Sequence, residues 1–134
     1  MIKHRGAEST EMKQLSDQVI GCAIRVHREL GPGLLESVYE ECLSYELSKA
    51  EIYHERQKVL PIIYDKIHLD AGYRIDLLID NKLIVELKAV ELLLPIHLAQ
   101  TLTYLRLADY RLGLLINFNV PLLIQGVKRV VNGY

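Results

Sequence analysis

The sequence predicts an α/β fold, in which helices pack on a mixed β-sheet. The first observation is that apolar residues follow helical spacing over residues 10–49 and then change to the period of two that is typical of strands. The second is a nearly apolar run at residues 83–90, followed by a helical segment and another apolar run at 112–118. Such a strand–helix–strand step should form a right-handed crossover. The expected order is ααβββαβ with a β-like tail.

Three helices are expected, at residues 10–30, 34–49 and 95–109. The first ends at Gly31-Pro32-Gly33, because glycine is a common helix C-cap and proline cannot continue a helix. The third begins with Pro95, in the first turn, where proline is tolerated. The helices therefore flank the segments in which the apolar period is two.

The strands follow from that period and from the turn residues between them. Pro61 interrupts the first strand, which indicates an edge or a bulge. The run at 83–90 is expected at the centre of the sheet because nearly all of its side chains are apolar. The tail is broken at Gly126, and residues 127–131 could form an exposed edge that favours a homo-oligomer, or an edge that a helix covers. The expected strands are 54–64, 67–70, 73–80, 83–90, 112–118 and 122–131.

Length and charge limit the class of protein. The 134 residues correspond to a single domain, 1–134, with residues 1–9 expected to be loose. Half of the residues are hydrophobic and a quarter are charged, which excludes a disordered chain. Lys and Arg total 16 against 17 Asp and Glu, a net charge of −1. This excludes a protein held on nucleic acid by basic charge alone, but not a nuclease whose bound metal supplies positive charge.

The sequence favours a cytoplasmic protein. Residues 1–10 are polar and lack the apolar core of a secretion signal. The longest apolar stretch, 90–98, is interrupted by charge and proline, so no membrane contact is expected. Cys22 and Cys42 form no C-x-x-C pair, which favours reduced, structural thiols.

Two charges lie within the most apolar strand. Glu86 and Lys88 are two residues apart, so they face the same side, and buried charges need partners or a metal. If the preceding loop is Asp80-Asn81-Lys82, an odd count, Asp76 falls opposite Glu86 with Cβ atoms about 5 Å apart. Such carboxylates repel unless a cation lies between them, which favours Mg²⁺ or Mn²⁺.

Other readings of these charges stay open. A two-residue loop would place Asp76 and Glu86 on opposite faces of the sheet and exclude a shared ion. The charges could also form a salt bridge between Lys88 and either carboxylate.

Further polar residues lie on the flanking helices. Glu36 is in the first turn of the second helix, and Tyr39 is on the same face three residues on. His97, Gln100 and Tyr104 form a polar line along the third helix. For Glu36, the alternative is a surface glutamate that the helix dipole stabilises. For the polar line on the third helix, the alternative is the partly buried boundary between its apolar and its exposed face.

The segment Gly33-Leu34-Leu35-Glu36-Ser37-Val38-Tyr39 matches the signature G-x-x-E-x-x-Y. With residues 26–33, 73–76, 85–89 and 113–118, it makes the chain resemble the GxxExxY proteins, a family of the PD-(D/E)xK nuclease superfamily, over roughly residues 15–131. The resemblance implies an αβββαβ core, a mixed sheet flanked by helices, to which the N-terminal helix is an addition.

The resemblance also implies roles for individual residues. Asp76 and Glu86 are similar to the metal ligands, and Lys88 to the lysine that positions water or stabilises charge on the phosphate. Glu36 is similar to a helix glutamate that supports the metal through water. Gln100 and Tyr104 resemble a Q-x-x-x-Y element that orients the lysine or the nucleic acid, and Tyr39 is a further candidate for orienting substrate. Ile75 stands where the superfamily motif has proline.

The implied function is hydrolysis of phosphodiester bonds in DNA or RNA with Mg²⁺ or Mn²⁺. One alternative is a catalytically inactive nuclease fold that binds nucleic acid or a protein partner. The near-neutral charge and the lack of a long basic stripe favour that alternative. Another is hydrolysis of a different phosphate ester at the same metal site.

Overall fold

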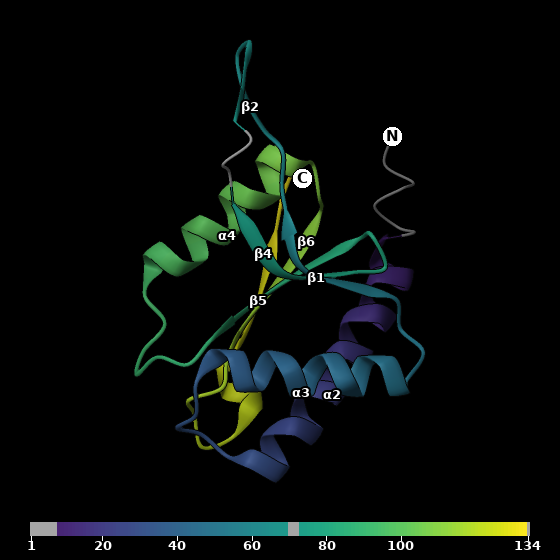
Figure 1. Cartoon of the computed structure of the whole chain (residues 1–134), viewed down its shortest axis with the longest axis vertical. Coiled ribbons are helices and arrows are strands. Elements are labelled where there is room, and N and C mark those ends of the chain that lie inside the picture. Colours follow the sequence, from purple (N-terminus) through teal and green to yellow (C-terminus); the bar gives the residue numbers. More distant parts are fainter. Residues whose placement is uncertain (1–7, 70–72, 134) are drawn as a thin grey trace.

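The computed structural model describes residues 8–69 and 73–133, with side chains from residue 10 onwards. A five-stranded sheet in the order β1-β4-β5-β6-β7 lies at the centre (Figure 1). β5 and β6 pair in parallel, while the other neighbouring strands are antiparallel. The predicted α/β class with a mixed sheet is therefore confirmed. The strands are β1 (His54–Val59), β4 (Arg74–Ile79), β5 (Leu83–Lys88), β6 (Leu112–Asn117) and β7 (Val127–Val131).

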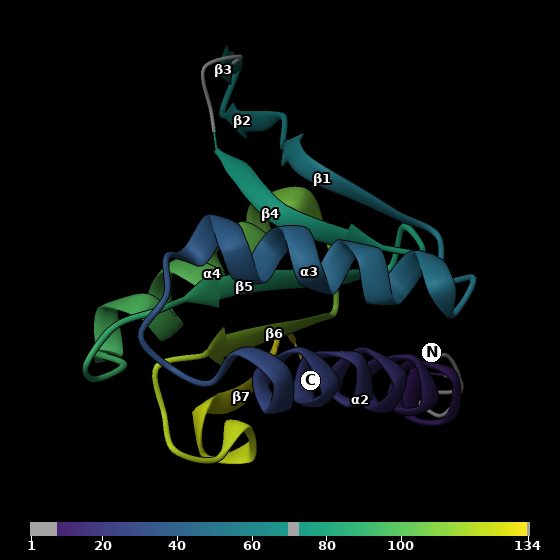
Figure 2. The same cartoon turned by 60° about the horizontal axis from the view of Figure 1, so that its bottom comes forward.

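Helices cover both faces of the sheet. α2 (Lys13–Leu30) and α3 (Glu36–Lys49) pack on one face, and α4 (Pro95–Ala108) packs on the other (Figure 2). Pro95 is in the first turn of α4, as predicted. A π-helical turn, η1 (Glu8–Met12), precedes α2, and a 3₁₀ turn, η2 (Leu123–Gly126), precedes β7.

Each face has its own apolar cluster. Side chains of α2 and α3, among them Val26 and Leu43, pack against Leu77, Val85 and Leu114 of the sheet. On the other face, residues of α4 such as Leu105 pack against side chains of β4, β5 and β7. β5 contributes to both clusters, which agrees with its predicted central position.

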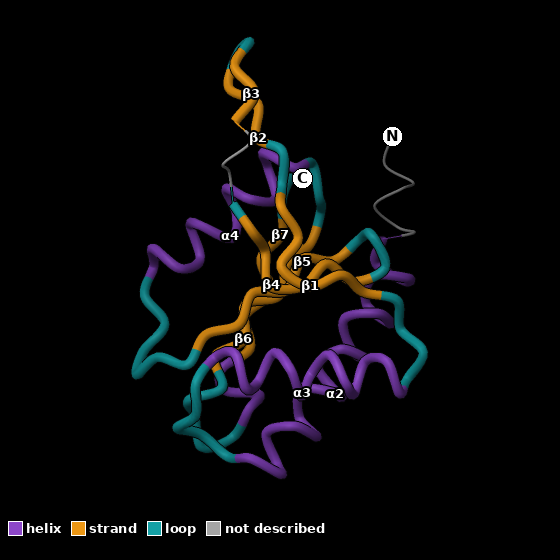
Figure 3. Tube along the Cα trace, in the orientation of Figure 1, coloured by secondary structure: helices purple, strands orange, loops and turns teal. Residues whose placement is uncertain are grey.

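The prediction of one strand over residues 54–64 is wrong. The chain leaves the sheet after β1, and β2 (Ile62–Tyr64) pairs with β3 (Ile67–Leu69) in a separate two-stranded hairpin that projects from the body (Figures 1 and 3). Pro61 explains this break, because proline has no N–H to continue a strand ladder. β1 therefore pairs with β4 and not with the next strand in the sequence.

Several other boundaries differ from prediction, among them the start of α3 and the start of the last strand. α3 begins at Glu36 and not at residue 34, because Leu35 is still extended and forms the N-cap. The tail begins as the 3₁₀ turn η2, and only Val127–Val131 forms a strand. That strand lies at an edge of the sheet, as predicted.

Among the described residues, no helix is both long enough and apolar enough to cross a membrane. Cys22 is buried, Cys42 is half-buried, and both are free thiols.

Candidate functional site

The β4–β5 hairpin has the three-residue loop on which the site prediction depends. Asp80 and Asn81 adopt left-handed φ angles of 51° and 56°, and the N–H of Lys82 donates to the carbonyl of Ile79 at 2.9 Å. Ile79 pairs with Leu83, and the register runs on to Leu77 opposite Val85. The next residues along this register are Asp76 and Glu86. The odd loop thus brings the two carboxylates together.

Asp76 and Glu86 are interlocked by hydrogen bonds between side chain and backbone. The N–H of Asp76 donates to Oε2 of Glu86 at 2.8 Å, and the N–H of Leu87 donates to Oδ2 of Asp76 at 2.8 Å. Each carboxylate accepts a hydrogen bond from the backbone of the opposite strand where the strand ladder ends. Both side chains are therefore held by rigid elements.

The strand is irregular at Asp76. Ile75 packs in the cluster beneath α4, but Leu77 packs in the cluster beneath α2 and α3. In a regular strand, residues two apart face the same side. Across from Asp76, Gln57 of β1 has a φ of 49°, in the left-handed region that a strand residue rarely adopts. Local distortion of both strands thus accompanies the position of Asp76.

α3 brings two further carboxylates to this region. Glu36 is exposed, and its Oε2 accepts a hydrogen bond from the N–H of Ala89 at 3.3 Å, just beyond β5. Glu40 is only 8% exposed and accepts hydrogen bonds from Gln57 at 2.7 Å and from Arg56 at 3.1 Å. Sequence reasoning missed Glu40 and Gln57. The i, i+4 spacing of Glu36 and Glu40 on one helix face was the available signal for Glu40.

The site carries an excess of negative charge. Burial, followed by the neighbouring charge of Asp76, raises the pKa of Glu86 to about 8. Burial also raises the pKa of Asp76, although hydrogen bonds from Leu87 and Gln57 oppose the shift. Both carboxyls thus resist ionisation in this environment, and a nearby cation would favour their charged forms.

Lys88 supplies positive charge near Glu86. Val85 and Leu87 face the α2–α3 side of the sheet, so Glu86 and Lys88 alternate onto the α4 side. The charge of Lys88 lowers the pKa of Glu86, yet within residues 8–69 and 73–133 Lys88 forms no ion pair. The Lys88 side chain is half-buried, so it is partly accessible from solvent.

The predicted polar line on α4 divides into three environments. His97 accepts a hydrogen bond from the N–H of Leu94 at 3.0 Å and thereby caps the helix. Gln100 is exposed. Tyr104 is buried against Tyr73, with ring centroids 4.5 Å apart, and burial followed by the charge of Glu86 raises its pKa to about 12. Tyr104 thus lies within electrostatic reach of the acidic residues.

The hydroxyl and the ring of Tyr39 are both engaged within the core. Its hydroxyl donates to the carbonyl of Gly31 at 2.6 Å and accepts a hydrogen bond from the N–H of Leu34 at 3.1 Å. Its ring stacks on Phe118, with centroids 4.4 Å apart, and is fully buried. Tyr39 holds the connection between α2 and α3, and so supports the start of the helix that carries Glu36.

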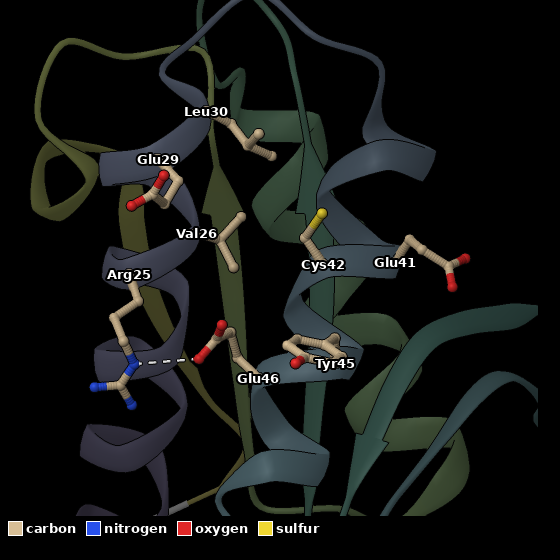
Figure 4. Close-up of a pocket in the computed structure, with 8 residues that line it drawn as sticks. All are labelled: Arg25, Val26, Glu29, Leu30, Glu41, Cys42, Tyr45 and Glu46. Carbon is tan, nitrogen blue, oxygen red and sulfur yellow. Dashed lines mark hydrogen bonds and ion pairs between the residues drawn. The ribbon is translucent and has the colours of Figure 1, made fainter.

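A groove of about 390 Å³ lies between α2 and α3, and neither Asp76 nor Glu86 lines it (Figure 4). An ion pair between Arg25 and Glu46, 3.3 Å long, crosses it, and Cys42 lines it. None of the predicted site residues lines this groove. The candidate site is therefore the end of the β4–β5 hairpin and not this hollow.

The donor set fits a hard divalent cation. In the described part of the chain, no three His, Cys, Asp or Glu side chains form a ready-made metal site. Mg²⁺, however, is usually held by one or two carboxylates, with water and substrate phosphate completing its shell. Asp76 and Glu86 could supply that pair, since the hydrogen bonds that they accept leave each carboxylate with free lone pairs.

Comparison with known proteins relates the chain to others at the level of a superfamily. A family model described as the PD-(D/E)XK nuclease superfamily matches residues 13–130. No curated protein and no solved structure matches the chain. The closer resemblance to the GxxExxY proteins stays a prediction.

Proposed function

The chain belongs to the PD-(D/E)XK nuclease superfamily, and from this premise we propose that it hydrolyses phosphodiester bonds of DNA or RNA with Mg²⁺ or Mn²⁺. Superfamily membership suggests nuclease activity and a nucleic-acid substrate, and nucleases of this class generally use divalent ions. The observation that carries the finer proposal is the interlocked pair of Asp76 and Glu86. A location in the cytoplasm and a homo-oligomer formed through the β7 edge are part of the same proposal.

Asp76 and Glu86 would hold the ion. A bound divalent ion lowers the pKa of a coordinated water and neutralises charge that develops on the phosphate. Hydrogen bonds from the backbone keep both carboxylates in place, so little reorganisation is needed to receive it. The raised pKa of Glu86 makes binding of an ion compete with binding of a proton.

Lys88, Glu36 and Tyr104 would act on the substrate side of the site. Lys88 places a positive charge on the same strand face as Glu86, where it could stabilise the scissile phosphate. Glu36, beside Ala89, could accept a hydrogen bond from water at the ion. Tyr104 and the exposed Gln100 belong to α4, which covers the sheet face toward which Lys88 alternates, and they could orient the nucleic acid from that face.

The test is titration of the protein with Mn²⁺ and Mg²⁺ by calorimetry, followed by assays on single-stranded and double-stranded DNA and on RNA. Asp76→Asn should abolish saturable Mn²⁺ binding and hydrolysis. Asp109→Asn, an exposed position after α4, should leave both unchanged.

Two results would contradict the proposal. One is equal Mn²⁺ binding by the wild type and Asp76→Asn. The other is a wild type that binds no ion and cleaves no substrate, which would favour a non-enzymatic module that binds nucleic acid or a protein partner.

A further inference from the structure

Gln57 bridges two carboxylates that belong to different elements. Its Nε2 donates to Oε1 of Glu40 on α3 at 2.7 Å and to Oδ1 of Asp76 on β4 at 3.2 Å. A carboxylate only accepts hydrogen bonds, so the amide nitrogen, and not the amide oxygen, must face this gap. Both protons of the amide group are thus committed to the two acids.

Glu40 is itself held in place. It is 8% exposed, and its second oxygen, Oε2, accepts a hydrogen bond from Nε of Arg56 at 3.1 Å. Arg56 also donates to Oε1 of Glu41 at 3.1 Å. A continuous chain of hydrogen bonds therefore runs from Arg56 through Glu40 and Gln57 to Asp76, the proposed metal ligand.

The backbone of β1 is distorted at this residue. Gln57 has a φ of 49°, whereas the other described non-glycine residues with positive φ, such as Asp65 and Asp109, lie in turns and not in strands. In the pairing of β1 with β4, Arg56 lies opposite Leu77 and Lys58 opposite Ile75, whereas Gln57 does not pair with Asp76. An exposed residue in a costly conformation is often kept for its function and not for stability.

We propose that Gln57 is a positioning residue: held by Glu40, it orients the carboxylate of Asp76 for a divalent ion. This inference rests on the proposed function. Without Gln57, the Asp76 carboxylate would keep, among the residues that the structure describes, only its hydrogen bond from Leu87, and it would lose the donor that it shares with Glu40. The amide donor supplies a neutral bridge between two groups that repel each other.

The principal test measures Mn²⁺ affinity by calorimetry together with unfolding in EDTA. Gln57→Gly removes the amide and also relieves the positive φ, so stability without metal should be kept or increased while Mn²⁺ affinity falls about 10-fold to 100-fold. Gln57→Glu keeps the size of the side chain but loses the donor, and should weaken binding at least as much. Gln125→Glu, an exposed position in η2, is the matched control and should bind as the wild type does.

A double-mutant cycle tests the role of Glu40. Glu40→Met should weaken Mn²⁺ binding, and combining it with Gln57→Gly should add little to the loss, since Glu40 acts through Gln57. Losses that multiply fully in the double variant would show that Glu40 contributes independently, and would overturn the chain of contacts.

The outcomes separate this inference from the proposed function. Wild-type Mn²⁺ binding that Gln57→Gly and Gln57→Glu retain in full would overturn the positioning role alone. A wild type that neither binds Mn²⁺ nor cleaves nucleic acid would overturn both proposals. A parallel loss of stability and affinity in Gln57→Gly would indicate a structural residue, and would also contradict the inference.

Discussion

The backbone N–H of Asp76 donates a hydrogen bond to the side chain of Glu86 at 2.8 Å. The return contact, from the N–H of Leu87 to Asp76, has the same length. The two carboxylates thus replace hydrogen bonds that the strand backbones would otherwise form with each other. This arrangement places like charges close together in a buried region and makes the site sensitive to pH and to cations.

The stability of the metal-free protein should fall as pH rises from about 4.5 to about 8. Folding raises the pKa of Glu86 from its ordinary 4.5 to about 8, so the folded state holds a proton that the unfolded state has released. This contribution is fully present below the unfolded pKa and is lost as pH passes through the folded value. The loss is at most about 1.4 kcal/mol per pH unit. Urea unfolding in EDTA at several pH values measures it.

Glu86→Gln is the comparison for this pH dependence. The amide does not titrate, so the variant should lose that part of the slope while other groups continue to contribute. Equal slopes for the wild type and Glu86→Gln would show that Glu86 ionises normally in the folded protein. Excess Mg²⁺ should flatten the wild-type curve, because the ion binds the ionised carboxylates.

Lys88→Met should reduce nucleic-acid hydrolysis about 10²-fold to 10³-fold, the usual loss when one stabiliser of transition-state charge is removed. Mn²⁺ affinity should change only a few-fold, since Lys88 is not a ligand. Steady-state cleavage and calorimetry on the same preparation separate the two effects. Lys128→Met, on the exposed side of β7, should cleave normally. Full activity of Lys88→Met would remove the lysine from the mechanism.

Tyr39→Phe should lower the free energy of unfolding by about 1–3 kcal/mol, because a buried hydroxyl that serves two backbone groups is lost. Chemical denaturation measures this change. Mn²⁺ affinity should stay within a few-fold of the wild type, because Tyr39 lies in the core and not beside Asp76. A loss of affinity or cleavage without a loss of stability would instead support the sequence-based prediction that Tyr39 orients substrate.

Gly126→Ala should destabilise the fold by about 1–3 kcal/mol, the usual cost of overpacking. A Cβ at Gly126 would collide with the carbonyl group of Asn117, which is backbone and cannot swing aside. Asn117 also binds both backbone groups of Val90, so the strain would reach the end of β5. Gly21→Ala in α2 is the control: its Cβ meets no atom within 4 Å, and it should leave stability unchanged or increase it. Thermal unfolding compares the two.

Local spacing predicted where several candidate residues lie relative to one another. The residues of the 80–82 loop are turn formers, and their odd count sets the pairing of β4 with β5. Strand alternation likewise places Lys88 on the side of Glu86. Pro61 marked the end of a strand, but the sequence did not show that the chain would leave the sheet to form the separate β2–β3 hairpin. A proline can end the hydrogen bonding of a strand, but it does not show which strand the following segment will pair with.

The sequence by itself determined the α/β class and the order of the main elements, and it limited Asp76 and Glu86 to meeting or facing apart according to the length of one short loop, because each depends on residues close in the chain. Only the tertiary structure decided that Glu40 and Gln57 join them and that Tyr39 does not. Glu40 reaches Gln57 across 17 residues, and Gln57 reaches Asp76 across 19. Those contacts depend on how α3 lies on the sheet and how β1 is kinked, and packing between distant segments, not periodicity, sets both.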